Sequence, residues 1–235
     1  MKKPALIFLP GLLNDARLWQ QQIDAVSDLA DCQVGDLTQA DSISALASLV
    51  LAHAPEGQFA LAGLSMGGYV ALEIMRQAPQ RVLALALLDT SARPDTPEST
   101  AGRRDAMALA DTDFQAVLDN LLPKLIHPSH LNDKTIVDNI MAMGLDLGKE
   151  VFQRQQTAII GRKDSRPYLS QITCPTLVLC GREDRITPVE IHEEIVAGIA
   201  TAELKVIDNA GHLSALDQAA AVSTALRGWL TSLQA

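Results

Sequence analysis

Residues 59–69 read FALAGLSMGGY, and their apolar start leads directly into the pattern Gly63-x-Ser65-x-Gly67. A helical pattern, VALEIM, follows at once over residues 70–75. This order predicts a buried strand, a sharp turn at the serine, and a helix whose positive N-terminal end faces the turn. A serine on such a turn is held in a strained backbone conformation and presents its hydroxyl outside the sheet. We therefore expect Ser65 to be a candidate nucleophile.

Five other segments read as strands, and helical patterns separate most of them. Parallel strands need long crossover connections, so this alternation predicts a mostly parallel sheet of about six strands with helices on both faces. A chain of 235 residues is long enough for one such α/β domain, which we expect to span residues 1–235. The segments expected to be strands are 5–9, 32–36, 58–64, 82–88, 175–180 and 203–207.

The alternation stops between about residues 92 and 166, where no segment reads as a strand. We interpret this stretch as a helical cap inserted into the domain. The alternative is a group of extra helices packed against one edge of the sheet. The helical patterns in the stretch fall near residues 103–110, 114–122, 131–145 and 150–160.

The formal net charge of −9 comes from acidic residues spread along the whole chain. This balance argues against nucleic acid or an anionic membrane surface as a partner. No apolar run approaches the roughly 20 residues that a membrane-spanning helix needs. The charge says little about the substrate, which we expect to be a small molecule, and the sequence does not predict an oligomeric state.

The cysteines, Cys32, Cys174 and Cys180, are odd in number, and their spacing matches no metal-binding motif. We expect reduced thiols, a cytoplasmic protein, and neither a metal nor a cofactor. The apolar run after Lys3 superficially resembles a secretory signal, but Pro10 interrupts it early. We therefore interpret that run as a core strand.

A serine nucleophile needs a base, and His212 is the best placed of the five histidines. His212 follows the last expected strand, and sites in open parallel sheets gather at the carboxyl ends of strands. The other histidines have less suitable positions. We expect His53 and His192 to be solvated or partly packed helix residues, and His127 and His130 to lie in a surface loop rather than to line a pocket.

The base needs an orienting acid, and Asp184 follows the penultimate strand at the same edge of the sheet. Spacing does not exclude the adjacent Glu183, and Asp89, at the end of strand 82–88, is a further candidate. We expect Asp208 and Asp217 to cap helices or to be solvated. The order Ser, Asp, His is the order that the α/β-hydrolase scaffold uses.

Three motifs together make the chain resemble an α/β-hydrolase of the small-cap group, which includes carboxylesterases, the esterase of biotin synthesis and enol-lactonases. The resemblance covers nearly the whole chain and implies a nucleophilic serine, a histidine base and an orienting aspartate. It also implies a helical lid and a sheet trimmed of the two antiparallel strands that begin the family fold. The motifs are Gly63-x-Ser65-x-Gly67-Gly68, Gly181-x-x-Asp184-x-x-x-Pro188 and Asn209-x-Gly211-His212.

Two backbone N–H groups are expected to form an oxyanion hole. One belongs to Met66, which follows the nucleophile, and the other to Leu12, in the loop after the first strand. Many relatives carry His-Gly in that loop, whereas this chain has Pro10-Gly11, and the alternative for Leu12 is a plain core residue. We expect Leu12 and Leu13 also to contact the substrate.

The expected activity is hydrolysis of carboxylic esters with small to medium acyl groups, through an acyl-enzyme. The same residues also serve lactone, enol-lactone and carbon–carbon bond hydrolysis, and a pyruvate-group elimination. A ligand sensor that keeps the triad is an alternative from another class. Arginines in or beside the cap are either solvated or bind a substrate carboxylate; they are Arg93, Arg103, Arg104, Arg154 and Arg162.

Overall fold

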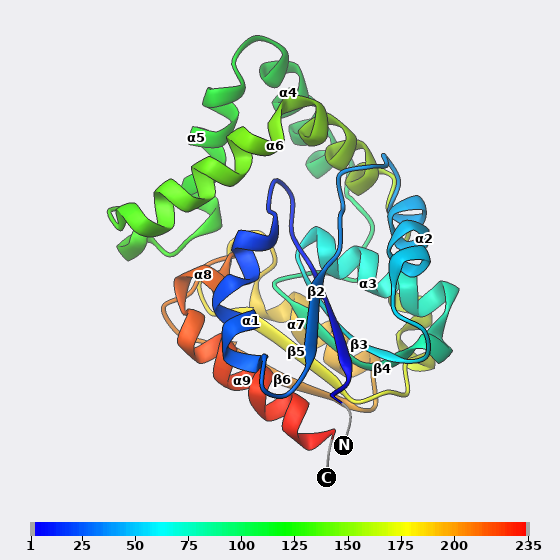
Figure 1. Ribbon diagram of the computed structural model, residues 1–235. Coiled ribbons are helices and arrows are strands. Elements are labelled where there is room, and N and C mark those ends of the chain that lie inside the picture. Colours follow the sequence, from blue (N-terminus) through cyan, green and yellow to red (C-terminus); the bar gives the residue numbers. More distant parts are fainter. Residues whose placement is uncertain (1–2, 234–235) are drawn as a thin grey trace.

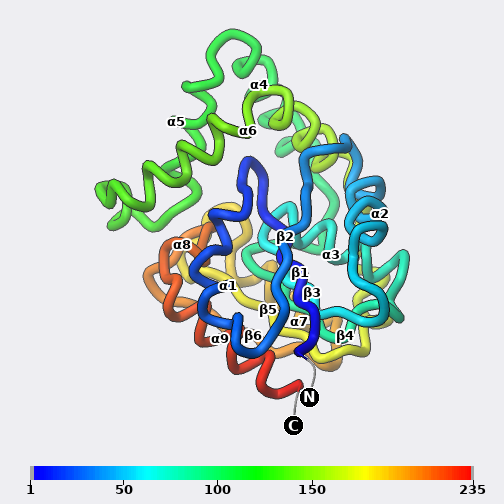
Figure 2. The backbone as a smooth tube through the Cα atoms, viewed as in Figure 1, coloured from blue at the N-terminus to red at the C-terminus, as the bar shows by residue number. Residues whose placement is uncertain are grey.

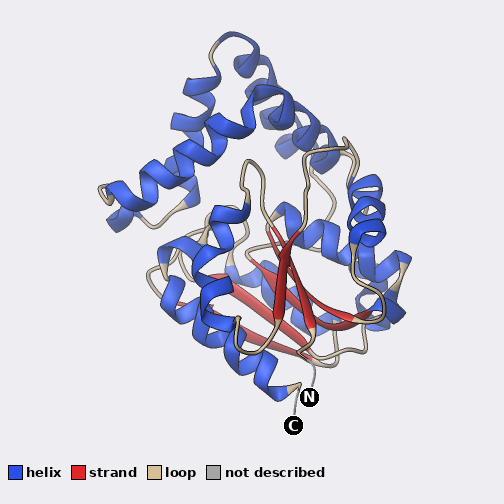
Figure 3. Cartoon of the chain, in the orientation of Figure 1, coloured by secondary structure: helices blue, strands red, loops and turns tan. Residues whose placement is uncertain are grey.

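A single parallel sheet runs through the computed structural model, which describes residues 3–233 (Figures 1 and 3). Its strands lie in the order β2-β1-β3-β4-β5-β6, and each neighbouring pair is parallel. The predicted six-stranded parallel sheet is confirmed. The strand bounds are β1 Ala5–Leu9, β2 Asp31–Val34, β3 Phe59–Leu64, β4 Val82–Leu88, β5 Thr176–Gly181 and β6 Ala202–Ile207.

Helices cover both faces of the sheet and form the connections between strands (Figure 1). The α-helices are α1 Gln20–Val26, α2 Ile43–His53, α3 Met66–Gln77, α4 Pro97–Thr112, α5 Phe114–Leu125, α6 Lys134–Ile160, α7 Val189–Gly198, α8 Ser214–Asp217 and α9 Ala219–Ser232. Short 3-10 segments are η1 Ala16–Trp19, η2 Pro79–Arg81, η3 Pro128–His130 and η4 Arg166–Gln171.

Alternate residues of each strand pack against opposite helical layers, because successive side chains in a strand point to opposite faces. Leu6 and Phe8 of β1 share one apolar cluster with residues of α1 and α9. Ile7 and Leu9 share the other cluster with residues of α2, α3 and α7. The sheet is thus buried on both sides, which explains why β3 and β5 read as continuous apolar runs.

The α4, α5 and α6 helices stand over the edge of the sheet at which the strands end (Figure 2). They have their own apolar cluster, in which Leu118 and Phe152 pack with Leu13 from the loop after β1. The loop after β1 therefore packs against these helices as well as against the sheet.

Several helix boundaries differ from the sequence prediction. α4 begins at Pro97 rather than near residue 103, because the Thr96 hydroxyl accepts a bond from the Ser99 N–H and proline suits the first helical turn. α6 spans two predicted helices, but Gly148 interrupts the helical backbone with φ 79° and ψ 175°. The connection between β1 and β2 is made by η1 followed directly by α1.

Gly67 lies where α3 crosses closest to β1, so we predict that Gly67→Ala strongly destabilises the protein. A Cβ there would lie 2.1 Å from the Leu9 carbonyl oxygen, and backbone cannot move aside as a flexible side chain can. The free energy of unfolding, measured by urea denaturation, should fall by more than about 2 kcal/mol.

Gly228→Ala in α9 is the matched control, because a Cβ there meets no described heavy atom within 4 Å. It should raise the free energy of unfolding by about 0.5–1 kcal/mol. Equal effects of the two substitutions would contradict the close packing of α3 on β1.

Candidate active site

Ser65 occupies the turn between β3 and α3 with φ 54° and ψ −115°, a region that a non-glycine residue rarely adopts. Two hydrogen bonds hold this strained residue. Its N–H donates to the Leu88 carbonyl oxygen at 3.0 Å, and the Thr90 hydroxyl donates to its carbonyl oxygen at 2.8 Å. The end of β4 therefore fixes the serine in the conformation that the sequence pattern predicts.

The structure brings Ser65, His212 and Asp184 together from the ends of β3, β6 and β5. The Ser65 Oγ lies 2.8 Å from His212 Nε2, and His212 Nδ1 lies 2.8 Å from Asp184 Oδ2. The histidine and the aspartate are each 3 % exposed. The result is an unbroken chain of hydrogen bonds from a serine hydroxyl to a buried carboxylate.

Asp184 is held in its ionised form. Burial alone would raise its pKa, but the charge of His212 and several hydrogen bonds outweigh burial and lower it. The Thr187 hydroxyl donates to Oδ2 at 2.7 Å, while the N–H groups of Ile186 and Thr187 donate to Oδ1 at 2.8 and 3.0 Å. Burial in turn opposes protonation of His212, yet the Asp184 charge raises the pKa of the imidazole above its usual value.

Neither alternative acid contacts His212 through a hydrogen bond in the described chain. Glu183 accepts a bond from the Ala210 N–H, on the other side of the loop. Asp89 is fully buried and accepts bonds from the Gly181 N–H at 2.9 Å and the Ser214 hydroxyl at 2.5 Å. Burial and then the Asp184 charge raise the pKa of Asp89 to about 8.

Two of the expectations for the remaining polar residues are wrong. His192 is fully buried rather than solvated or partly packed: its Nε2 accepts the Thr90 N–H at 2.9 Å, and burial lowers its pKa to about 4. Asp217 is buried rather than capping or solvated. It accepts bonds from the Gly211 N–H at 2.6 Å, the His127 N–H at 2.7 Å and His130 Nδ1 at 2.7 Å.

The backbone N–H groups of Met66 and Leu12 make no hydrogen bond within the described residues. Met66 is the first residue of α3, where the backbone N–H has no intrahelical acceptor. The Leu12 N–H has no hydrogen-bond acceptor in the part of the chain that the structure describes. The loop before Leu12 lies close to the serine, since a Cβ added at Gly11 would be 3.4 Å from the Ser65 Cβ.

Gln155 of α6, which no sequence motif singles out, holds the loop after β1 through two hydrogen bonds. Its Oε1 accepts the Leu13 N–H at 2.9 Å, and its Nε2 donates to the Leu37 carbonyl oxygen at 3.1 Å. The glutamine is fully buried, and Leu13 has a positive φ of 55°. A helix far along the chain therefore holds the backbone at Leu13, the residue next to Leu12.

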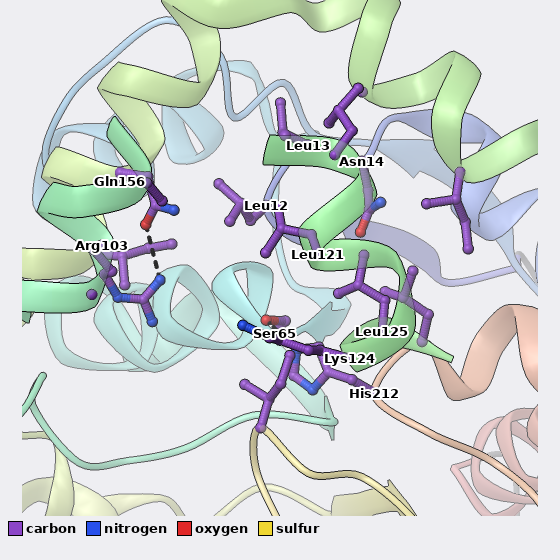
Figure 4. A pocket seen from close by; sticks show the side chains of 18 of the residues that line it. Leu12, Leu13, Asn14, Ser65, Arg103, Leu121, Lys124, Leu125, Gln156 and His212 are labelled. Atoms are coloured by element: carbon purple, nitrogen blue, oxygen red, sulfur yellow. Dashed lines mark hydrogen bonds between the residues drawn. The ribbon is translucent and has the colours of Figure 1, made fainter. Parts of the chain in front are cut away.

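A cavity of about 270 Å³ opens at Ser65 and His212, beneath α4, α5 and α6 (Figure 4). Leu12 and Leu13, which we expect to contact the substrate, are among the residues that line it. Arg103 also lines it and is not a solvated surface residue. The remaining arginines do not line it; Arg104 is exposed, Arg93 pairs with Glu194, Arg154 donates to the Thr38 carbonyl oxygen, and Arg162 pairs with Asp95.

Within residues 3–233, no cluster of three or more His, Cys, Asp or Glu side chains could hold a metal ion. The same residues contain no helix with the length and apolar character needed to cross a membrane.

The chain belongs to the alpha/beta hydrolase family, whose model matches residues 6–225. Among curated proteins it is similar to 3-oxoadipate enol-lactonase 2 of Acinetobacter baylyi, with 23 % identity over 95 % of this chain and 87 % of that protein. The family resemblance inferred from the three motifs is confirmed.

Two solved structures support the same fold. A thermophilic esterase from Thermogutta terrifontis is 29 % identical, with a TM-score of 0.91 over 100 % of this chain and 92 % of that one. The enol-lactonase from Burkholderia xenovorans LB400 is 24 % identical, with a TM-score of 0.89 over 98 % of this chain and 92 % of that one.

Proposed function

We propose that the protein is a serine hydrolase that cleaves carboxylic esters of small to medium acyl groups. The observation that carries this proposal is the hydrogen-bonded series Ser65–His212–Asp184 at the floor of a cavity. Membership of a hydrolase family and the likeness to an esterase support it. The free thiols of Cys32, Cys174 and Cys180 and an expected cytoplasmic location belong to the same proposal.

In the proposed reaction, His212 Nε2 accepts the Ser65 proton as Oγ attacks the ester carbonyl carbon. The negative charge that develops on the carbonyl oxygen is held by the N–H groups of Leu12 and Met66. His212 then returns the proton to the leaving alcohol. In the second step it activates a water molecule, which hydrolyses the acyl-enzyme and frees the serine.

Asp184 orients the imidazole so that Nε2 faces the serine, and stabilises the imidazolium that forms in each step. Its bonds from Thr187 and Ile186 leave Oδ2 directed at His212 Nδ1. Segment 92–166, which contains α4, α5 and α6, acts as a cap that excludes water and shapes the acyl site. Leu12 and Leu13 supply apolar contacts at the base of that site.

Lactone hydrolysis is the second candidate, because two enol-lactonases are among the similar proteins. The chemistry is the same except that the alcohol formed on ring opening stays attached to the acyl group, so hydrolysis of the acyl-enzyme frees a single hydroxy acid. A lactone panel run beside the ester series therefore distinguishes the two candidates by substrate alone. A ligand sensor would hydrolyse both panels very slowly.

Ser65→Ala tests the proposal directly. Without the nucleophile, kcat/KM for p-nitrophenyl acetate should fall by more than about 10⁴-fold, because only binding and oxyanion contacts remain. The thermal transition should be nearly unchanged, since the substitution removes one partly exposed hydroxyl. Unchanged turnover in this variant would rule out Ser65 as the nucleophile.

Asp184→Asn and Asp89→Asn distinguish the orienting acid from its neighbour. Asp184→Asn should lower kcat by about 10³–10⁴-fold, whereas Asp89→Asn should stay within about tenfold of the parent protein. The opposite ranking would make Asp89 the orienting acid.

The pH profile gives an independent readout of the same pair. The base must be neutral, so kcat/KM should rise with pH through the pKa of His212, which Asp184 holds above its usual value. In Asp184→Asn this midpoint should move to lower pH because the stabilising carboxylate is gone. A midpoint that does not move would show that Asp184 does not raise the pKa of His212.

Gln155→Leu tests the link between α6 and the oxyanion loop. Losing the bond to the Leu13 N–H should displace the neighbouring N–H of Leu12 and lower kcat by up to about 100-fold, with little change in KM. Gln153→Leu is the control, because Gln153 donates to the Met107 carbonyl oxygen within the cap and not to the loop. Equal losses in the two variants would contradict a specific role for Gln155.

A further inference from the structure

The charged side chains that line the cavity above Ser65 are opposite in sign to the net charge of the protein. The whole chain carries a formal net charge of −9, yet the charged side chains that line the cavity, apart from His212, are the cations Arg103 and Lys124. No aspartate or glutamate is among the described residues that line it. A positive site in an acidic protein attracts and retains anions.

Arg103 of α4 is not fully neutralised by its own partners. Its Nε donates to Asp95 Oδ1 at 3.2 Å and its Nη1 to Gln156 Oε1 at 2.9 Å (Figure 4). Arg162 also donates to Asp95 Oδ1, at 2.7 Å. One buried carboxylate thus serves two guanidinium groups, and one positive charge is left in excess.

The excess charge is presented to the cavity. The Nη2 of Arg103 has no hydrogen-bond acceptor among the residues that the structure describes. Arg103 lines the same cavity as Ser65 and His212. Its side chain is 20 % exposed, so water screens it only in part.

Lys124, in the last turn of α5, supplies a second cation on an otherwise apolar wall. Its ammonium group pairs with no acidic side chain in the described chain, and Leu121 and Leu125 line the cavity beside it. Lys124 is exposed, so water and salt screen its charge. It therefore attracts an approaching anion but does not hold the anion in one position. Asn14 adds a neutral polar group: its Oδ1 is buried and has no partner among the described residues.

We infer that the substrate is an ester or lactone that also carries a free carboxylate, which Arg103 binds while the acyl carbon lies at Ser65. This inference rests on the proposed function and names its substrate class. A planar guanidinium suits a carboxylate, because two of its N–H groups can donate side by side. Leucines line the same cavity, among them Leu12, Leu118 and Leu121, and suit the methylene chain of a dicarboxylic acid half-ester.

The test compares p-nitrophenyl half-esters of dicarboxylic acids, from glutarate to suberate, with the corresponding monoamides, which have the same shape without the charge. At the best chain length, kcat/KM should favour the carboxylate by about tenfold or more, as expected for a hydrogen-bonded charge. Raising the ionic strength should reduce the preference by screening Lys124.

Arg103→Met should abolish the preference, so that kcat/KM for the half-esters falls to the value for the corresponding monoamides in the same variant. Arg103→Lys keeps the charge and should retain part of the preference, which separates charge recognition from a general disturbance of α4. Arg104→Met, an exposed arginine next in sequence, is the matched control and should retain all of it.

Two outcomes have different consequences. If the monoamides are hydrolysed as well as the half-esters at every chain length, the substrate inference is wrong and the proposed ester hydrolysis stands. If the parent protein hydrolyses neither series, the proposed function fails and the inference fails with it.

Discussion

The His212 imidazole is hydrogen-bonded at both ring nitrogens, to the Ser65 hydroxyl and to the Asp184 carboxylate. These two bonds require three loops, which follow three different strands, to meet within a few ångströms. The parallel sheet satisfies this requirement because β3, β5 and β6 all end at the same edge. The position of the His212 ring therefore depends on the order and direction of the strands in the sheet.

Buried polar residues outside this series hold the loops together. Asp89 joins the end of β5 to α8 through the Gly181 N–H and the Ser214 hydroxyl. Asp217 ties the Gly211 N–H, next to the histidine, to the His127 N–H below the cap helices. Because each of these carboxyls is buried and fully used in hydrogen bonds, the loops have few alternative arrangements.

Helix α6 and the loop after β1 are connected in the same manner. Gln155 of α6 accepts the Leu13 N–H, so the helices that shape the substrate cavity also set the backbone beside Ser65. Arg103 of α4 brings a charge to the same cavity. In the proposed mechanism, substrate selection and transition-state stabilisation therefore depend on the same group of helices.

The positions of the three proposed catalytic residues can be predicted from local sequence patterns. The turn at Ser65, the loop containing Asp184 and the loop containing His212 each combine short-range pattern with a position after a strand, so sequence alone predicts their proximity. Asp89, His192 and Gln155 are different. Their partners are Gly181 and Ser214, Thr90, and Leu13, all distant in sequence, and no local pattern encodes such contacts.

The cap shows the same limit. Its helices follow from periodicity, but whether an arginine on them faces water or the cavity depends on how the helices pack. Arg103 and Arg104 are adjacent and chemically identical, yet only Arg103 lines the cavity. Helix packing in the cap, rather than residue type, therefore decides the chemistry of the substrate site.

The central claim is that His212 makes the Ser65 hydroxyl a nucleophile, and site-resolved labelling with a fluorophosphonate tests it most directly. The protein is mixed with the reagent, digested, and the modified peptide identified by mass spectrometry in the parent protein and in His212→Ala. The account predicts one modified residue, Ser65, and a rate of labelling that falls by orders of magnitude without the histidine. An unmodified Ser65, or equally fast labelling in both proteins, would contradict it.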